Sequence, residues 1–444
     1  MTPSIDIGHW RSRLAALADE FEVPGASLAF SHERAETLAC ATGVLNRSTA
    51  APVSVDSLFQ IGSITKVWTT TQLMLLIEQG RLTLETPVAG VLPEFAVRDT
   101  RATRAVTVRQ LLTHTSGIDG DLFVDTGRGG DCLRRYVEAC AGLDQLFSPG
   151  AGQSYCNAGF VIAGRIVERL TGLEWDEALK AQIIEPLGLT HTCTLPEDAL
   201  RFATALGHGD DGAPADVWGL PRSMGPAGLV CARAKDVVAF GRAHLTPGAL
   251  LADPQALRVP QVRVPNPYVD AEQWGLGWGL TSWDGRQVAF HGGDTIGQHA
   301  MLWVLPATDT VVALLTNGGR ACEFQHAVAS ELFQELAGVT VPAPLTPPTQ
   351  PVAVDTERFA GVYERAGSRI TATVHAGALR LRTEPTGALE GLAPVREFTL
   401  TAVDENTFLA RHDQASLWDA VVFETAPDGT SFLRYSGRAT PKAR

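Results

Sequence analysis

Hydrophobic positions near the start of the chain recur with the spacing of one helical face. Trp10, Leu14, Leu17 and Phe21 predict an amphipathic helix. Pro24-Gly25 ends this pattern, and two strand-like stretches, ASLAF and ETLACATG, follow on either side of SHER. The chain therefore begins with a predicted helix that leads into a β-hairpin.

The middle of the chain has mainly helical patterns. The stretch from Ser63 to Gln79 is apolar on nearly every side and contains no Gly or Pro, which predicts a buried helix. Patterns typical of helices continue from about 105 to 245. Strand patterns return in QVAFHGG, HAMLWVLP and TVVALLTN, before a last helical stretch. This order predicts an α+β fold, in which one antiparallel sheet built from both ends of the domain is flanked by helices and faces an all-helical half across a cleft.

A proline-rich stretch divides the chain. Residues 341–352, VPAPLTPPTQPV, hold five prolines and no charge, as a semi-rigid linker does. Beyond them short alternating stretches predict a β-meander, with RITATV and ALRLRT forming a hairpin across HAG. We expect a domain over 1–340, a linker over 341–352 and a small antiparallel barrel or curved sheet over 353–444.

Composition narrows the function classes. A formal net charge of −13 argues against nucleic acid or an anionic membrane as a partner. The first residues lack the pattern of an export signal, which predicts a cytoplasmic protein. The seven cysteines are scattered and form no CxxC pair, and GHGDDG at 207–212 is expected to be a solvated turn. We therefore predict neither a metal site nor a cofactor.

Candidate chemistry begins with SITK at residues 63–66. Lysine is scarce in the chain, yet one of the four stands three residues after Ser63. Residues three apart share a helical face, so Lys66 can direct its amine at the Ser63 hydroxyl. A desolvated lysine can lose its proton and act as a base, whereas arginine cannot. On these residues alone, a surface serine beside a solvated lysine is about as good an interpretation.

Two further motifs change that balance. In GQSYCNAGF, Tyr155 can relay a proton and the Asn157 amide can orient a carbonyl, although a helix cap with a core tyrosine would look the same. In AFHGGDTIG, His291 precedes Gly292 and Gly293, which allow close backbone approach, and the N–H of Asp294 or a neighbour can serve an oxyanion.

Together, SITK, YCN and HGG resemble the serine β-lactamase and penicillin-binding-protein superfamily, specifically its class C-like branch, over about residues 8–338. The resemblance implies that Ser63 is acylated, Lys66 is the general base, and Tyr155 shuttles protons beside Asn157. HGG stands where that family more often has Lys-Thr-Gly. This departure removes the usual clamp for a carboxylate, so we do not expect penicillinase or carboxypeptidase activity.

The β-rich end resembles the lipocalin-like domain that some members carry. HTSGIDGDLFVDTGRGGD and the closing GRATPK look most like the penicillin-binding-protein-type thioesterases that release nonribosomal peptides as macrocycles. The resemblance implies a stand-alone peptide cyclase whose substrate is a peptidyl thioester, including one presented on a carrier protein. The alternatives are a D-aminopeptidase or carboxylesterase of the same fold and, as a third class, a non-catalytic binding or sensor protein. His114 and Cys156 are expected to be structural, whereas Trp274 and Trp278 are expected either to line the cleft or to fill the core.

Overall fold

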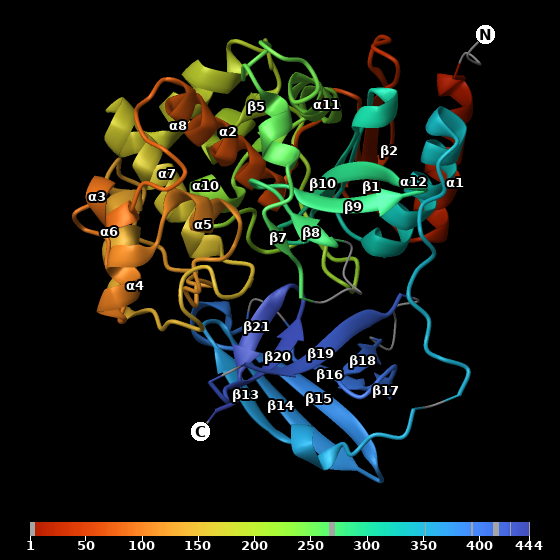
Figure 1. The fold of residues 1–444 in the computed structure, drawn as a ribbon. Helices are drawn as coiled ribbons and strands as arrows, with labels where there is room; N and C mark the ends of the chain where they lie inside the picture. The colour runs from red at the N-terminus through yellow and green to blue at the C-terminus, as the bar shows by residue number, and fades with distance from the viewer. Residues whose placement is uncertain are drawn as a thin grey trace.

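The computed structural model describes residues 5–265, 271–350, 352–391, 394–411, 417–426 and 428–443. Position 351 of the predicted linker lies outside them. Figure 1 shows a larger body that contains a sheet and most of the helices, with a smaller β-rich body beneath it. Among the described residues, no helix has the length and apolar character needed to cross a membrane.

A nine-stranded antiparallel sheet forms one side of the larger body. Its order is β3-β2-β1-β12-β11-β10-β9-β8-β7, so the hairpin from the start of the larger domain pairs with a strand from the other end of that domain, as predicted. The strands are β1 (Gly25–Ser31), β2 (Leu38–Asn46), β3 (Ala51–Pro52), β7 (Val262–Arg263), β8 (Gln273–Trp274), β9 (Gly279–Trp283), β10 (Arg286–Asp294), β11 (His299–Leu305) and β12 (Thr310–Thr316).

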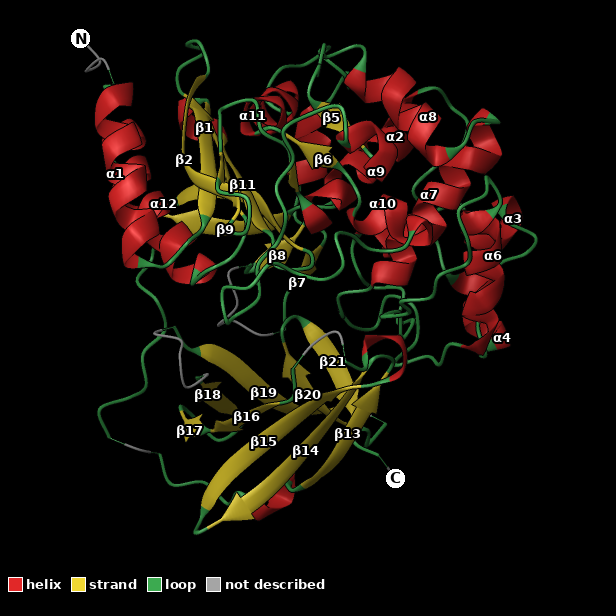
Figure 2. Ribbon diagram, turned by 180° about the vertical axis from the view of Figure 1, so that it is seen from behind, coloured by secondary structure: helices red, strands yellow, loops and turns green. Residues whose placement is uncertain are grey.

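Helices cover both faces of this sheet. On the outer face lie α1 (Ile7–Glu20) and α12 (Ala321–Ala337), whose apolar residues share one core with the strands. Trp10, Leu14 and Leu17 are buried there, which confirms the helix predicted from their spacing. The inner face packs against α11 (Ala234–Ala243) and the helical half (Figure 2).

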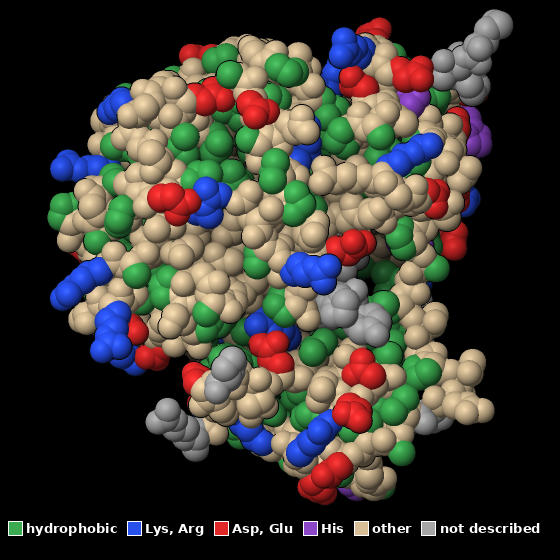
Figure 3. Space-filling view, viewed as in Figure 1, with side chains coloured by type: hydrophobic (Ala, Val, Ile, Leu, Met, Phe, Trp, Pro, Cys, Tyr) green, Lys and Arg blue, Asp and Glu red, His purple; other side chains and the backbone are tan. Residues whose placement is uncertain are grey.

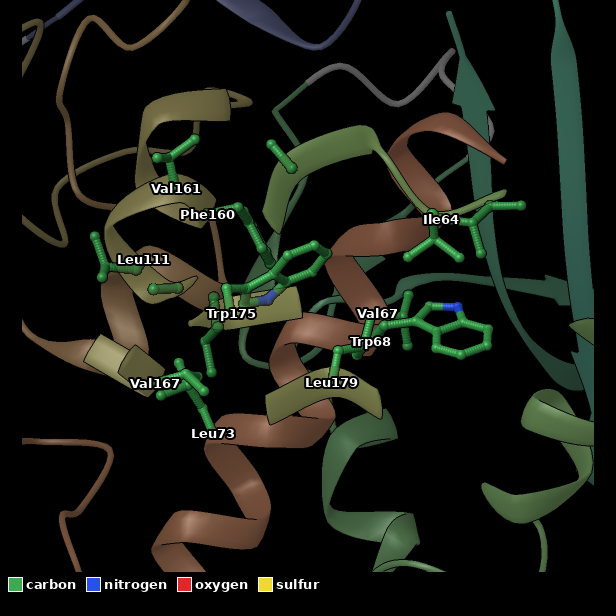
Figure 4. Close-up of a cluster of buried hydrophobic side chains, with 14 of the residues drawn as sticks. Ile64, Val67, Trp68, Leu73, Leu111, Phe160, Val161, Val167, Trp175 and Leu179 are labelled. Carbon is green, nitrogen blue, oxygen red and sulfur yellow. The ribbon is translucent and has the colours of Figure 1, made fainter. Parts of the chain in front are cut away.

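The helical half is built around two buried helices. α2 (Thr65–Glu78) follows the short 3-10 turn η1 (Gly62–Ile64), and α7 (Asn157–Thr171) packs against it. Figure 4 shows side chains of both helices interlocking with Trp175. The surrounding helices are α3 (Val88–Val91), α4 (Thr100–Ala105), α5 (Val108–Leu112), α6 (Cys132–Ala139), α8 (Trp175–Leu179), α9 (Pro196–Ala199) and α10 (Gly225–Gly228).

A small three-stranded sheet includes the residues just before the turn of Ser63. It has the order β4-β6-β5, with β4 (Phe59–Gln60), β6 (Cys231–Ala232) and β5 (Thr192–Cys193). His208 of the predicted solvated turn is instead buried: its Nδ1 donates to Asn317 O at 2.7 Å, and its Nε2 accepts from Arg47 N at 3.1 Å. The expectation for this turn was wrong for His208, since a histidine can be buried when both ring nitrogens are bonded.

The C-terminal domain has its own hydrophobic core and two antiparallel sheets. The predicted hairpin across HAG is present, with Ala376 and Gly377 at positive φ in its turn. A bridge between Tyr363 and Lys442 joins the first and last strands. The strands are β13 (Gly361–Arg365), β14 (Ser368–His375), β15 (Ala378–Pro385), β16 (Arg396–Thr399), β17 (Thr401–Ala402), β18 (Thr407–Ala410), β19 (Asp419–Thr425), β20 (Ser431–Tyr435) and β21 (Arg438–Pro441).

No helix or strand lies between α12 and the turn η7 (Glu357–Phe359) in the described part of the chain. The two domains meet through loops of the helical half and the hairpin β20-β21 (Figure 1). On the face in Figure 3, acidic and basic side chains are interspersed, without a broad patch of basic residues.

Candidate active site

Ser63 and Lys66 lie against each other at the start of the central helix. Ser63 belongs to the turn η1, two residues before α2 begins at Thr65, and Lys66 belongs to the first turn of α2. Lys66 Nζ is 2.9 Å from Ser63 Oγ and donates to Ala227 O at 2.8 Å. The structure thus brings the two residues together, as their spacing predicted.

Burial sets the charge of Lys66. The residue is 0% exposed, and this desolvation is the main reason that its pKa lies well below the usual value for lysine. The positive charge of Arg438 lowers the pKa further, while Asp121 acts in the opposite direction. A neutral amine at this position can accept the proton of the Ser63 hydroxyl.

Tyr155 completes a cluster around the serine. Lys66 Nζ lies 4.9 Å from the centre of the Tyr155 ring, and the Ser63 hydroxyl is close enough to the phenol to lower the pKa of Tyr155. Burial raises the pKa of Tyr155 above its ordinary value, and the nearby Ser63 hydroxyl only partly offsets this. The phenol is therefore neutral near pH 7 and can donate a proton.

His114 and Trp274 pack against the Tyr155 ring. His114 stacks on it at 4.2 Å between ring centres, and Trp274 contacts it edge-on at 6.2 Å. His114 Nδ1 accepts from Cys156 N at 3.0 Å, so His114 ties two loops together, as expected. Trp274 thus borders the cluster, whereas Trp278 is fully buried against His244.

Strand β10 brings its glycines directly against the serine turn. A Cβ on Gly293 would lie 1.9 Å from Ile61 O and 2.9 Å from Ser63 N. A Cβ on Gly62, which has φ +50°, would lie 2.7 Å from Asp294 N. The backbone N–H groups of Ser63 and Asp294 are thus carried by two segments in tight contact, and only glycine fits between them.

His291 is buried at the same edge and stays neutral. Its Nδ1 donates to Gly292 O at 2.6 Å, and its Nε2 has no partner among the described residues. Burial, assisted by the nearby Lys66, lowers the pKa of His291 to about 3. Near neutral pH the imidazole offers an acceptor, where a lysine would offer a cation.

Asn157 points toward an acidic residue that the sequence reasoning did not assign. Asn157 Nδ2 donates to Asp121 Oδ1 at 2.7 Å. Arg438 of the C-terminal domain donates to the other oxygen of Asp121 at 2.7 Å, and its guanidinium lies 4.9 Å from the Tyr155 ring centre. Asp121 and Arg438 stand in the stretches GIDGDLF and GRATPK, which attracted notice for their resemblance but carried no assigned role.

Comparison with known proteins agrees with this geometry. The model of the family described as Beta-lactamase matches residues 10–331, so the chain belongs to that family. It is 46% identical over 376 residues to Penicillin-binding protein 4 of Amycolatopsis lactamdurans, with 82% of this chain and 98% of that protein covered. The resemblance stated from SITK, YCN and HGG is thereby confirmed.

Solved structures extend the likeness over both domains. The crystal structure of SurE matches 98% of this chain and 99% of its own, with a TM-score of 0.79 and 27% identity, and SurE has also been solved with D-Leu. A D-amino acid amidase from Ochrobactrum anthropi SV3 matches in fold, with a TM-score of 0.60 at 24% identity over 71% of this chain and 92% of its own. The predicted fold class is confirmed, and the protein is a serine acyl-transfer hydrolase of the β-lactamase and penicillin-binding-protein fold.

Proposed function

We propose that this protein releases a peptidyl thioester by forming an ester on Ser63, and that the amine of the same peptide then attacks this ester to give a macrolactam. The observation that carries the acyl-enzyme step is the 2.9 Å contact between the Ser63 hydroxyl and a fully buried Lys66 amine. An uncharged base within hydrogen-bond distance is what a serine nucleophile requires.

In the acylation step, Ser63 Oγ attacks the thioester carbonyl while Lys66 takes the hydroxyl proton. The N–H groups of Ser63 and Asp294 stabilise the negative oxygen of the tetrahedral intermediate. The carbon–sulfur bond then breaks, and the proton passes through Tyr155 to the leaving thiolate. A phenol whose pKa is raised suits this donor role better than a base role.

In the release step, the amine of the peptide attacks the ester carbon of acylated Ser63. Its proton passes to Lys66 and Tyr155 and returns to Ser63 Oγ as the ester bond breaks. Cyclisation outruns hydrolysis when the amine is held beside the ester, for which effective molarities of about 10⁵ M or more are attainable. Gly437 and Arg438 of the C-terminal domain contact Tyr155, which supports the proposal that this domain forms part of the wall of the active-site cleft.

Two features support an acyl donor that has no free carboxylate at its reacting end and that ends in a D-residue. A neutral His291 in place of a lysine provides no charge for a free carboxylate, which agrees with a thioester donor and with the absence of penicillinase chemistry expected from the sequence. The SurE structure with D-Leu supplies a D-residue ligand in a protein that matches both domains.

Incubation with a linear peptidyl thioester ending in a D-residue tests the proposal. We expect cyclic product by mass spectrometry, and only linear acid from the same peptide with its amine acetylated. Ser63→Ala should give neither product and no acyl-enzyme mass. Linear acid as the sole product of the unblocked peptide would refute cyclisation while leaving the serine chemistry in place.

The alternative is a hydrolase of the same fold that uses water as the acceptor. The fold-level match to a D-amino acid amidase favours this second candidate. Turnover of D-amino acid amides or simple esters, together with hydrolysis of the unblocked thioester, would establish it. Acylation of Ser63 without any release would instead indicate a sensor.

A further inference from the structure

The segment before α7 is held by the C-terminal domain. Three consecutive residues of this segment hydrogen-bond to the hairpin β20-β21, and they include Tyr155 itself. The bonds are Arg434 Nη1 to Gln153 O at 2.6 Å, Ala439 N to Ser154 Oγ at 3.0 Å, and Tyr155 N to Gly437 O at 2.9 Å. The position of the tyrosine thus depends on a domain that begins after the linker.

One carboxylate connects this interface to the neighbouring Asn157. Asp121 Oδ1 accepts from Asn157 Nδ2 at 2.7 Å, while Asp121 Oδ2 accepts from Arg365 Nη1 at 2.5 Å and from Arg438 Nε at 2.7 Å. The exposed fraction of the side chains is 6% for Asp121, 15% for Arg365 and 22% for Arg438. Ionic hydrogen bonds in such surroundings are strong and strict in geometry.

The charges at this point make Asp121 hard to replace. Burial alone would raise the pKa of Asp121, but Arg438 and Arg365 outweigh that effect and bring the pKa to about 2. Burial lowers the pKa of Arg365, and the positive charge of Arg438 lowers it further. Without the carboxylate, two partly buried cations of the C-terminal domain would face each other uncompensated, and the ion pairs that join this domain to the loop of Asp121 would be lost.

Asp119, two residues earlier on the same loop, gives a natural comparison. Its Oδ2 accepts from Ala366 N at 2.7 Å, so it also contacts the C-terminal domain. Its hydrogen bonds involve neither Asn157 nor the two arginines. Burial raises the pKa of Asp119 to about 6, and a neutral amide oxygen can accept the same hydrogen bond.

We propose that Asp121 is a positioning residue through which docking of the C-terminal domain orients the Asn157 amide. One oxygen holds the amide and the other holds the domain, so the amide is correctly aimed only when the domain is docked. The proposal rests on acyl transfer by Ser63 and does not depend on cyclisation.

A double-mutant cycle on the full chain tests this role, with hydrolysis of p-nitrophenyl acetate as the readout and Ser63→Ala as the background. We expect Asp121→Asn to lower kcat/KM by about tenfold or more, because Asn157 loses its acceptor geometry. Asn157→Ala should cause a similar loss. The double variant should be less than about twofold worse than either, since residues that act as one unit are not additive.

Asp119→Asn is the matched control, and its kcat/KM should fall less than about threefold. A merely structural role for Asp121 would make its effect multiply with that of Asn157→Ala, and this outcome would overturn the proposal. Retention of parental kcat/KM by Asp121→Asn would overturn it as well. If circular dichroism shows Asp121→Asn to be unfolded, Arg365→Met replaces it in the cycle with the same expected non-additivity.

Discussion

Single charges decide whether the serine can be activated. Lys66 is useful only as a neutral amine. Tyr155, His114 and His291 surround it, while burial, Arg438, Asp121 and Cys156 determine how readily it loses its proton. Burial contributes most to its low pKa, and Arg438 contributes next. A residue of the C-terminal domain therefore influences the general base of the other domain.

Replacing Arg438 should change the pH dependence of acylation in a defined direction. Without its positive charge, and with Asp121 less neutralised, the pKa of Lys66 rises, so less of the amine is neutral at a given pH. The rate increases with pH as Lys66 deprotonates, and the acid limb of the kcat/KM profile should move to higher pH. Near neutral pH the loss should not exceed about 10²-fold.

The profile is measured with p-nitrophenyl acetate for the parent, Arg438→Ala and the control Arg380→Ala. Arg380 is an exposed arginine on β15 of the same domain, and its variant should keep the parental limb. An acid limb that stays in place in Arg438→Ala, or moves to lower pH, would contradict the assignment of that limb to Lys66.

At the scale of elements, the contact between β10 and the serine turn is the tightest feature of the site. Gly292 and Gly293 are neighbours on this strand, but they differ in what an added Cβ would meet. A Cβ on Gly293 would lie 1.9 Å from the Ile61 carbonyl oxygen, whereas a Cβ on Gly292 would lie 3.0 Å from Sδ of the flexible Met301 side chain. Backbone cannot yield as a methionine side chain can.

Gly293→Ala should therefore displace β10 from Ser63. We expect a loss of about 1–3 kcal/mol in the free energy of unfolding and at least about 10²-fold in turnover, because an oxyanion donor moves with the strand. Gly292→Ala should lose clearly less on both measures. Urea unfolding and ester hydrolysis of the two variants check this, and equal effects would show that the close contact has no special role.

Elements and motifs were predictable from sequence where the determining interactions are local. Ser63 and Lys66 lie within one helical turn, and helix and strand patterns depend on residues only a few positions apart in the chain. The spacing of residues in the sequence therefore revealed both. Asp121 and Arg438 are 317 residues apart, and the ion pair between them forms only when the two domains dock. No local pattern encodes that docking, which is why the interface escaped sequence reasoning while the serine did not.

At the scale of the whole molecule, the interface and not the linker should hold the two domains together. Buried ion pairs at Asp121 and the hydrogen bonds around Tyr155 join the domains, while the residues between α12 and η7 form no helix or strand where they are described. Buried pairs are also poorly screened by salt. The active site is then a property of the assembled chain.

Cutting the linker at an inserted protease site within 341–350 should therefore leave turnover within about twofold of the uncut protein, because docking does not rely on chain continuity. The two pieces should elute together in size-exclusion chromatography, even at high salt, and uncut protein with the same insertion is the control. Residues 1–340 separated from the cut pair should lose turnover, since Tyr155 and Asn157 then lack the contacts that place them. Full turnover by that isolated piece would mean that the C-terminal domain has no part in the chemistry at Ser63.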